Sequence, residues 1–246
     1  MTRSHVNLTP DDVIALLKRS QLPTVVIEGD LDALVFRSFE EENSLTGLSV
    51  LPVGGRTCLL EVFSRRDEIQ NGRLVFFADR DAWVYSQLPD AYVSSSIVFT
   101  DGYSIENDAY RDGNFEQYLY ASEKSAFSGD LERFVEWYAL ALERMLGGEE
   151  SSISLNPHHV LGPQHSDLVS LKDGEEYPQQ LKSIIVADHS RLIRGKSLLK
   201  LLLLQLGKSS RAARHSAEAL MEVAVNGNGP LLQDAFTRIK AELGVG

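Results

Sequence analysis

The sequence predicts an α/β fold, in which a parallel sheet flanked by helices is followed by a mainly helical C-terminal part. In the first part of the chain, short apolar runs alternate with segments of helical spacing, which is the order of βαβ units. The run at residues 74–78 (LVFFA) has no polar alternation, as is typical of a strand buried on both faces of a parallel sheet. Beyond residue 108 the apolar residues recur mainly at helical spacing, so the sheet is expected before that point.

Composition and charge restrict the class of protein. The 246 residues are 43% hydrophobic and 24% charged, a typical composition for a globular protein. The net charge of −11 argues against a protein that coats a nucleic-acid duplex, because phosphate neutralisation dominates such binding. It leaves room for an enzyme that holds one phosphate through metal ions and a local basic patch. Cys58 is the only cysteine, which excludes a disulfide framework and fits a reducing cytoplasm.

Targeting and membrane signals are not expected in this chain. Residues 1–12 have no apolar core of the signal-peptide type. The most apolar run, at residues 198–206, is far shorter than the ~20 residues that span a bilayer. We therefore expect a cytoplasmic protein that does not associate with membranes.

Local signals define the elements of the α/β part. Thr9 and Pro10 suit the N-cap and the first position of a helix within residues 1–22. Asn71-Gly72 predicts a turn before the third strand. The β-α-β-α-β-α-β order implies right-handed crossovers between parallel strands. The expected strands cover residues 24–27, 48–53, 74–78 and 96–100.

The C-terminal part is expected to be built from helices and one long loop segment. A stripe of apolar residues between Leu131 and Leu142 predicts a helix that begins near Gly129 and ends at Gly147. The other expected elements are a loop-rich segment at 149–178, a short helix or strand at 179–188, and helices at 197–207, 209–225 and 231–243.

Two regions follow from this pattern. Residues 1–107 form an α/β core with an N-terminal helix, and residues 108–246 form a mixed loop and helical region that completes the site and carries a surface for partners. The leucine-rich helix at 197–207 is apolar on all sides. Such a helix is either buried in its own chain or part of an oligomer interface, for example that of a homodimer.

Two carboxylates stand one residue apart at the end of the strand 74–78. Asp79 and Asp81 can face the same point because alternate residues of an extended segment point the same way. Ligands of open α/β sheets bind at the carboxyl ends of strands. Mg²⁺ or Mn²⁺ accepts a few carboxylates together with water and phosphate oxygens. Metal binding is one interpretation, and a solvated turn that caps a following helix is the other.

Glu28 belongs to the same predicted edge, because it follows the strand 24–27. One glutamate and an aspartate pair can hold one or two divalent cations that polarise a phosphoryl oxygen. Glu28 also suits general acid–base chemistry, and Gly29 lets the backbone turn sharply and keeps the adjacent space open. Glu106, after the fourth strand, is a further candidate metal ligand or, alternatively, an acidic residue at a helix N-terminus.

Two further positions are candidates for contact with phosphate. Gly54-Gly55 lies between a strand and a helix, where backbone amides can face an anion, although a tight turn without a ligand fits the sequence equally well. Lys196 opens the leucine-rich helix and can neutralise charge that develops on a phosphate during a reaction. The alternative for Lys196 is an ordinary solvated lysine.

The order of these motifs resembles the TOPRIM domain, a Rossmann-like fold shared by topoisomerases, primases and OLD-type nucleases. The likeness covers residues 22–107 and rests on Glu28-Gly29, Gly54-Gly55 and the Asp79-x-Asp81 motif. The segments 101–107 (DGYSIEN) and 193–196 (IRGK) extend it to the OLD-related TOPRIM nuclease family. Within that family the chain resembles the AriB-type effector subunits of PARIS anti-phage defence systems.

This resemblance implies a Mg²⁺-dependent endonuclease that is toxic when free. Glu28, Asp79, Asp81 and Lys196 are the expected catalytic residues, and Glu106 joins the three acids as an expected metal ligand. The resemblance also implies an ABC-type ATPase partner that holds the nuclease inactive until a phage is sensed. RNA, for example transfer RNA, is the expected substrate in preference to DNA.

Two other functions are consistent with the residues. An apolar strand that ends in Asp-x-Asp also occurs in nucleotide-sugar glycosyltransferases, where it holds a metal-bound diphosphate, but Glu28-Gly29 has no explanation there. The other alternative is a non-catalytic, metal-binding regulatory subunit of an ATPase, which the acidic charge and the leucine-rich helix favour.

Overall fold

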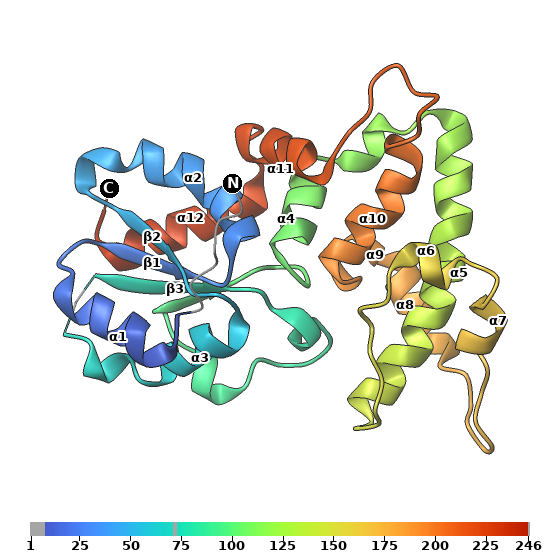
Figure 1. Cartoon of the computed structure of the whole chain (residues 1–246), viewed down its shortest axis with the longest axis horizontal. Helices are drawn as coiled ribbons and strands as arrows, with labels where there is room; N and C mark the ends of the chain where they lie inside the picture. The colour runs from blue at the N-terminus through green and yellow to red at the C-terminus, as the bar shows by residue number, and fades with distance from the viewer. Residues whose placement is uncertain (1–7, 71–72, 246) are drawn as a thin grey trace.

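Four parallel strands in the order β2-β1-β3-β4 form the centre of one lobe of the molecule (Figure 1). A computed structural model describes residues 8–70 and 73–245, with the side chains of all these residues except Asp30 and Leu31. The predicted turn at Asn71-Gly72 lies outside the described residues. The strands are β1 (Thr24–Ile27), β2 (Ser49–Pro52), β3 (Leu74–Ala78) and β4 (Ile97–Phe99).

Successive side chains of each central strand enter different apolar layers, because the side chains of a strand alternate between its two faces. Val25 and Phe77 belong to a large core that continues into the rest of the molecule. Val26 and Phe76 belong to a smaller core on the other face. Since β1 and β3 are buried on both sides, they read in the sequence as continuous apolar runs.

Helices cover both faces of the sheet (Figure 1). The smaller core is closed by α1 (Pro10–Arg19) and α3 (Arg56–Ser64), which contact each other. The larger core is closed by α2 (Asp30–Glu42) and by the last helix, α12 (Pro230–Leu243), which contacts β3 and β4. We call this part, with α4 (Ile105–Asp112) and α11 (Ala217–Asn226), the sheet lobe.

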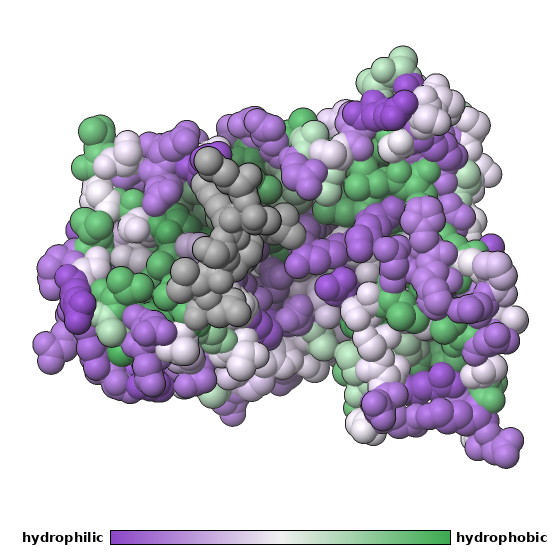
Figure 2. Space-filling model, in the orientation of Figure 1, coloured by the Kyte–Doolittle hydropathy of each residue, from purple (hydrophilic) through white to green (hydrophobic). Residues whose placement is uncertain are grey.

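The second lobe is helical and is organised around the long helix α5 (Figure 1). Helices α8 and α10 pack along α5, and α9 connects them to α4 of the sheet lobe. Seen from one face, the surface is hollowed between the two lobes, and hydrophilic residues gather there (Figure 2). The helices of this lobe are α5 (Ala121–Leu146), α6 (Pro157–Val160), α7 (His165–Leu168), α8 (Gln179–Ala187), α9 (His189–Leu192) and α10 (Gly195–Leu206).

The predicted fold class is confirmed: the chain has a parallel α/β sheet flanked by helices and a helical C-terminal part. The capping signals at Thr9 and Pro10 are confirmed as well, because the Thr9 hydroxyl accepts a bond from the Asp12 amide and Pro10 begins the helix. Short 3₁₀ helices complete the connections: η1 (Ser44–Thr46), η2 (Arg66–Glu68), η3 (Asp81–Tyr85), η4 (Asp90–Tyr92) and η5 (Phe115–Tyr118).

Two predicted helix boundaries were wrong. Helix α5 begins at Ala121, before the expected start at Gly129. The expected helix 209–225 is helical only from Ala217, because residues 208–216 form a loop that Arg211 anchors. The Arg211 guanidinium pairs with Glu123 and donates a hydrogen bond to the Tyr118 carbonyl, 3.0 Å away.

The leucine-rich helix α10 is buried inside its own chain. Leu198, Leu201 and Leu202 are fully buried, and the helix packs against α4 and α5. Burial within the chain therefore accounts for its composition. Among the described helices, none combines the length and the apolar character needed to cross a membrane.

Candidate functional site

The candidate site lies at the carboxyl ends of β1 and β3, the two central strands. Glu28 directly follows β1, and Asp79 directly follows β3. The direction of strand order reverses between these strands, which is where open α/β sheets bind ligands. The two residues are in contact, since the Asp79 amide donates a hydrogen bond of 2.9 Å to Glu28 Oε1.

Asp79 is a partly buried carboxylate at the end of β3. Its Oδ1 accepts a hydrogen bond of 2.9 Å from the amide of Ile105, the first residue of α4. Burial raises the pKa of Asp79 well above its ordinary value, and the charges of Asp32, Glu106, Glu28 and Asp81 raise it further. The predicted acidic residues are thus close enough to repel one another.

Asp81 is held in a strained backbone conformation beside Asp79. Its φ of +49° lies in the left-handed region, which a few non-glycine residues such as aspartate tolerate. Its amide donates a hydrogen bond of 2.7 Å to the Tyr103 carbonyl, which stabilises this turn. Burial raises the pKa of the Asp81 carboxyl, while the nearby guanidinium of Arg56 opposes that rise.

Arg56 connects the carboxylates, and the sequence interpretation did not include it. Its Nη1 lies 3.5 Å from Glu28 Oε1 and 3.1 Å from Asp81 Oδ2. The same nitrogen donates to the backbone carbonyl of Asp79, and the guanidinium stacks 4.3 Å from the centre of the Trp83 ring. Its position directly after Gly54-Gly55 indicated that it lies at the same edge of the sheet, but not the direction of its side chain.

Glu28 is poised between its charged and neutral forms. Burial raises its pKa to about 7, although the Asp79 amide and Arg56 favour the charged form. Asp32, which caps α2, accepts a bond of 2.8 Å from the Gly29 amide and adds negative charge nearby. The expected sharp turn at Gly29 is absent, since its φ of −157° is extended backbone that any residue adopts. The expected open space beside it is present.

A cavity of about 500 Å³ adjoins the acidic residues where α4, α10 and α11 meet. Glu106 lies in its wall and is only 4% exposed. Opposite charges come from α10 and the residue before it, since Arg194 and Lys196 both favour the charged form of Asp81. The cavity therefore joins the carboxylates of Glu106 and Glu218 to three cations and an apolar wall. Its lining includes Glu106, Arg194, Lys196, Lys200, Leu203 and Met221.

The glycine pair after β2 adopts backbone conformations that suit glycine. Gly54 has a φ of +84° and Gly55 a φ of +136°, and Gly55 is the N-cap of α3. No atom lies within 4 Å of a Cβ placed at either position. The tight-turn interpretation is therefore sufficient for both residues, and their contact with phosphate stays a prediction.

The donor set suits a divalent cation in its chemistry but not in its present arrangement. Across residues 8–70 and 73–245, no three His, Cys, Asp or Glu side chains are arranged to hold a metal ion. Asp79 accepts a hydrogen bond from the Ile105 amide, and Arg56 lies between Glu28 and Asp81. All the donors are carboxylate oxygens, however, and a bound cation would offset the repulsion that raises the pKa of Asp79. Metal ligation stays a prediction.

The structure brings together the residues that the sequence placed in the site. Glu28, Asp79, Asp81 and Glu106 act on one another's charge, and Lys196 acts on Asp81. Arg56, Arg194 and Lys200 are the site residues that the sequence interpretation missed. No model of a known protein family matches the chain, and no curated protein matches it either.

Proposed function

We propose that the chain is a Mg²⁺-dependent nuclease that breaks a phosphodiester bond. The observation that supports this proposal is a cluster of carboxylates with cationic side chains of α10 and its N-cap close enough to act on it. Four carboxylates gather at the carboxyl end of the sheet, and Lys196 and Arg194 lie within electrostatic range of Asp81. A phosphodiester needs this combination, because it must be held by cations while the attacking oxygen is activated.

Each residue has a distinct role in the proposed reaction. Glu28, Asp79, Asp81 and Glu106 would hold the cation, which when bound would supply positive charge to the phosphate oxygens. The oxygen of water or of a substrate hydroxyl bonds to phosphorus and gives up its proton to solvent, the bond to the leaving oxygen breaks, and the leaving oxygen takes up a proton from solvent. Lys196 and Arg194 stabilise the added negative charge on the phosphate. Arg56 lies between Glu28 and Asp81 and favours the ionised form of each.

The resemblance to OLD-related TOPRIM nucleases supports the biological part of the proposal. On that basis the chain acts in the cytoplasm as the effector of an anti-phage system, and an ABC-type ATPase holds it inactive until a phage is sensed. RNA, for example transfer RNA, is the favoured substrate over DNA. The net charge of −11 fits an enzyme that depends on metal ions and on a local basic patch, since the surface as a whole repels nucleic acid.

The test is cleavage of total RNA and of plasmid DNA by the purified chain with Mg²⁺. Glu28→Gln and Asp79→Asn keep the side-chain shape but remove the charge, and each is expected to lower the cleavage rate at least about 100-fold. Glu132→Gln, an exposed residue of α5 far from the site in sequence, is the matched control and should cleave like the wild type. Chelation of Mg²⁺ should abolish cleavage.

The outcome also separates the alternatives. If the Glu28 and Asp79 variants cleave as fast as the wild type, the assignment of the site is wrong. Thermal stabilisation by a nucleotide sugar with Mn²⁺, and none by nucleic acid, would support a glycosyltransferase instead. A stable complex with an ATPase, with no nuclease activity after release, would support a regulatory subunit.

A further inference from the structure

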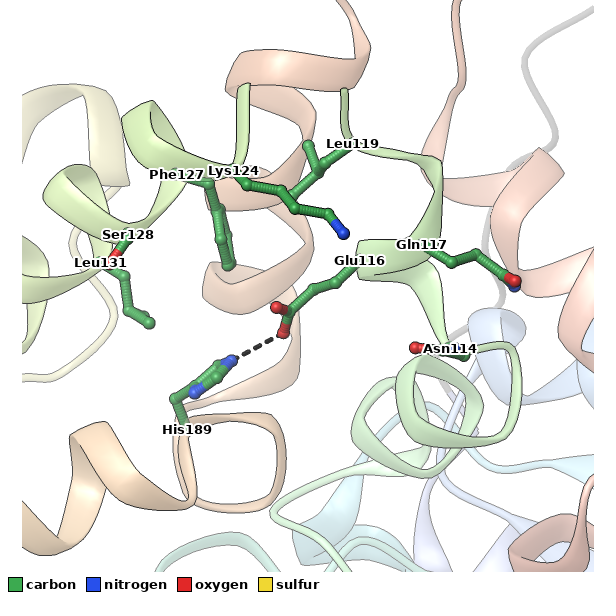
Figure 3. A pocket seen from close by; sticks show the side chains of 9 residues that line it. All are labelled: Asn114, Glu116, Gln117, Leu119, Lys124, Phe127, Ser128, Leu131 and His189. Atoms are coloured by element: carbon green, nitrogen blue, oxygen red, sulfur yellow. Dashed lines mark hydrogen bonds and ion pairs between the residues drawn. The ribbon is translucent and has the colours of Figure 1, made fainter. Parts of the chain in front are cut away.

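A second cavity lies in the helical lobe, on residues that the proposed reaction does not use. It has a volume of about 330 Å³ and is enclosed by η5, the first turns of α5, and α9 (Figure 3). This volume is at the lower end of the range that small-molecule sites occupy, roughly 300 to 1,000 Å³. Its wall combines three charged side chains with three buried apolar ones, namely Glu116, Lys124 and His189 with Leu119, Phe127 and Leu131.

His189 is held as a cation by its two neighbours. Its Nδ1 lies 3.2 Å from the Val186 carbonyl, and its Nε2 lies 2.8 Å from Glu116 Oε1. Both neighbours are acceptors, so both ring nitrogens must carry a proton to satisfy them. Burial opposes the charged ring, but the bond and the charge of Glu116 outweigh it and raise the pKa of His189.

Glu116 is correspondingly held as an anion. The bond from His189 lowers its pKa, and the same Oε1 accepts a bond of 2.9 Å from the Tyr110 hydroxyl. One carboxylate oxygen therefore serves two donors inside the protein. Within the described part of the chain, no hydrogen bond reaches its other oxygen, which is available to the cavity.

Lys124 is an exposed side chain that adds a positive charge beside Glu116. Its amino group points toward the cavity above Glu116 (Figure 3). It is near enough to lower the pKa of Glu116, yet it forms no ion pair with any described residue. With His189 protonated, Lys124 and His189 together outweigh Glu116, so the lining carries a net positive charge.

The apolar side of the cavity is large enough for a ring or a branched chain. Phe127 and Leu131 point into it from successive turns of α5 (Figure 3). Phe127, Leu119 and Leu131 are all buried, so they form the base of the cavity. An anion with an apolar body matches both halves of this lining, because ligand sites combine an apolar wall with a few polar groups that orient the ligand.

We infer that this cavity is a binding site for a small organic carboxylate with an aromatic or branched apolar body. The carboxylate pairs with Lys124 beside the His189–Glu116 pair, and the apolar body packs against Phe127 and Leu131. The inference does not depend on the nuclease proposal, since none of these residues belongs to the acidic site.

The test is calorimetric titration of the full chain with phenylacetate and three matched compounds. Phenylacetamide has the same shape without the charge, acetate has the charge without the ring, and phenylethylamine has the ring with a positive charge. Phenylacetate is expected to bind with a sub-millimolar dissociation constant. Each of the other three should bind at least about tenfold more weakly, because each loses the ion pair or the apolar contact.

Variants of two α5 residues locate the site. Lys124→Gln is expected to weaken phenylacetate binding at least about tenfold. Arg133→Gln, another exposed cation of the same helix, should leave it unchanged. The imidazole resonances of His189 should shift on titration in the wild type. The inference is overturned if phenylacetate fails to bind, if it binds no better than phenylacetamide, or if Lys124→Gln binds it as tightly as the wild type.

Discussion

Arg56 determines how the acidic site is charged. Its guanidinium contacts Glu28, Asp81 and the backbone of Asp79, while its face lies against Trp83. Without a cation at this position, three carboxylates that approach one another would take up protons to relieve their repulsion. Arg56 thus favours the charged forms of Glu28 and Asp81, and a substrate phosphate would compete for the same guanidinium.

Substitution of glycine by alanine is expected to change the free energy of unfolding in opposite directions at two positions. Gly55→Ala places a Cβ on backbone with a φ of +136° and a ψ of 167°, a region that only glycine adopts readily, and should cost about 1–3 kcal/mol. Gly129→Ala lies inside α5, where no atom lies within 4 Å of the new Cβ, and should stabilise by about 0.5–1 kcal/mol.

Urea unfolding followed by circular dichroism measures both changes. The two variants have the same chemical difference from the wild type, so each serves as the control for the other. If both changed the free energy of unfolding in the same direction, the backbone conformation assigned to Gly55 would be wrong.

Among single residues, the sequence could predict those of the site that directly follow a strand. Glu28 and Asp79 were predictable because the carboxyl ends of neighbouring parallel strands must meet. Arg56 was not, because the direction of a long side chain depends on Trp83, which lies beyond the next strand in the sequence. The sequence predicted a cluster of carboxylates alone. It could not predict that Arg56 lies between Glu28 and Asp81.

Among the elements, α9 joins the two lobes through its backbone. Asn107, in α4, is fully buried and donates hydrogen bonds of 2.8 Å to the carbonyls of Ser190 and Ile193. The Tyr103 amide bonds to the Arg191 carbonyl, 2.9 Å away. This joint places Arg194 and the start of α10 beside the acidic residues. A Cβ on Gly195 would lie 2.2 Å from Ser104 Oγ, so glycine permits the close approach.

Asn107→Ala is expected to destabilise the protein by about 2 kcal/mol or more. The substitution removes the donor of one buried and one partly buried carbonyl group, and unsatisfied groups of this kind are costly. It should also speed hydrogen exchange in α9 and at the start of α10, which mass spectrometry can follow. Asn226→Ala, an exposed asparagine at the end of α11, is the matched control and should change stability by less than about 0.5 kcal/mol.

If hydrogen exchange in α9 of Asn107→Ala were as slow as in the wild type, the hydrogen bonds of Asn107 would not hold α9 against α4. The sequence could not have predicted this connection, because Asn107 and Ile193 are far apart in the chain and the motifs that contain them do not indicate a contact between them. The first part of the helix predicted at 209–225 is a loop for a similar reason. Helical spacing was present, but the contacts of Arg211 with Glu123 and Tyr118 hold that segment as a loop.

On the scale of the whole molecule, the C-terminal helix α12 packs against the N-terminal part of the chain. Phe236 in α12 stacks on Phe39 of α2, with ring centres 4.5 Å apart, and meets Phe36 edge-on at 5.5 Å. Asp112, at the end of α4, caps α12 by accepting bonds from the amides of Leu231 and Leu232. One apolar core runs from the sheet into the helical lobe. The two lobes are therefore expected to unfold together.

Phe236→Ala tests this coupling. Truncation of a buried phenylalanine costs about 3–5 kcal/mol, and here it opens the core between α2 and α12. The chain has two tryptophans, Trp83 in the sheet lobe and Trp137 in the helical lobe, so each can report on one lobe when the other is replaced by phenylalanine.

In urea, both probes should give the same midpoint, and Phe236→Ala should lower both equally. Val223→Ala, an exposed position of α11, should move neither. A shift reported by Trp83 alone would mean that the helical lobe folds independently, and that the continuous core does not couple the acidic site to α5.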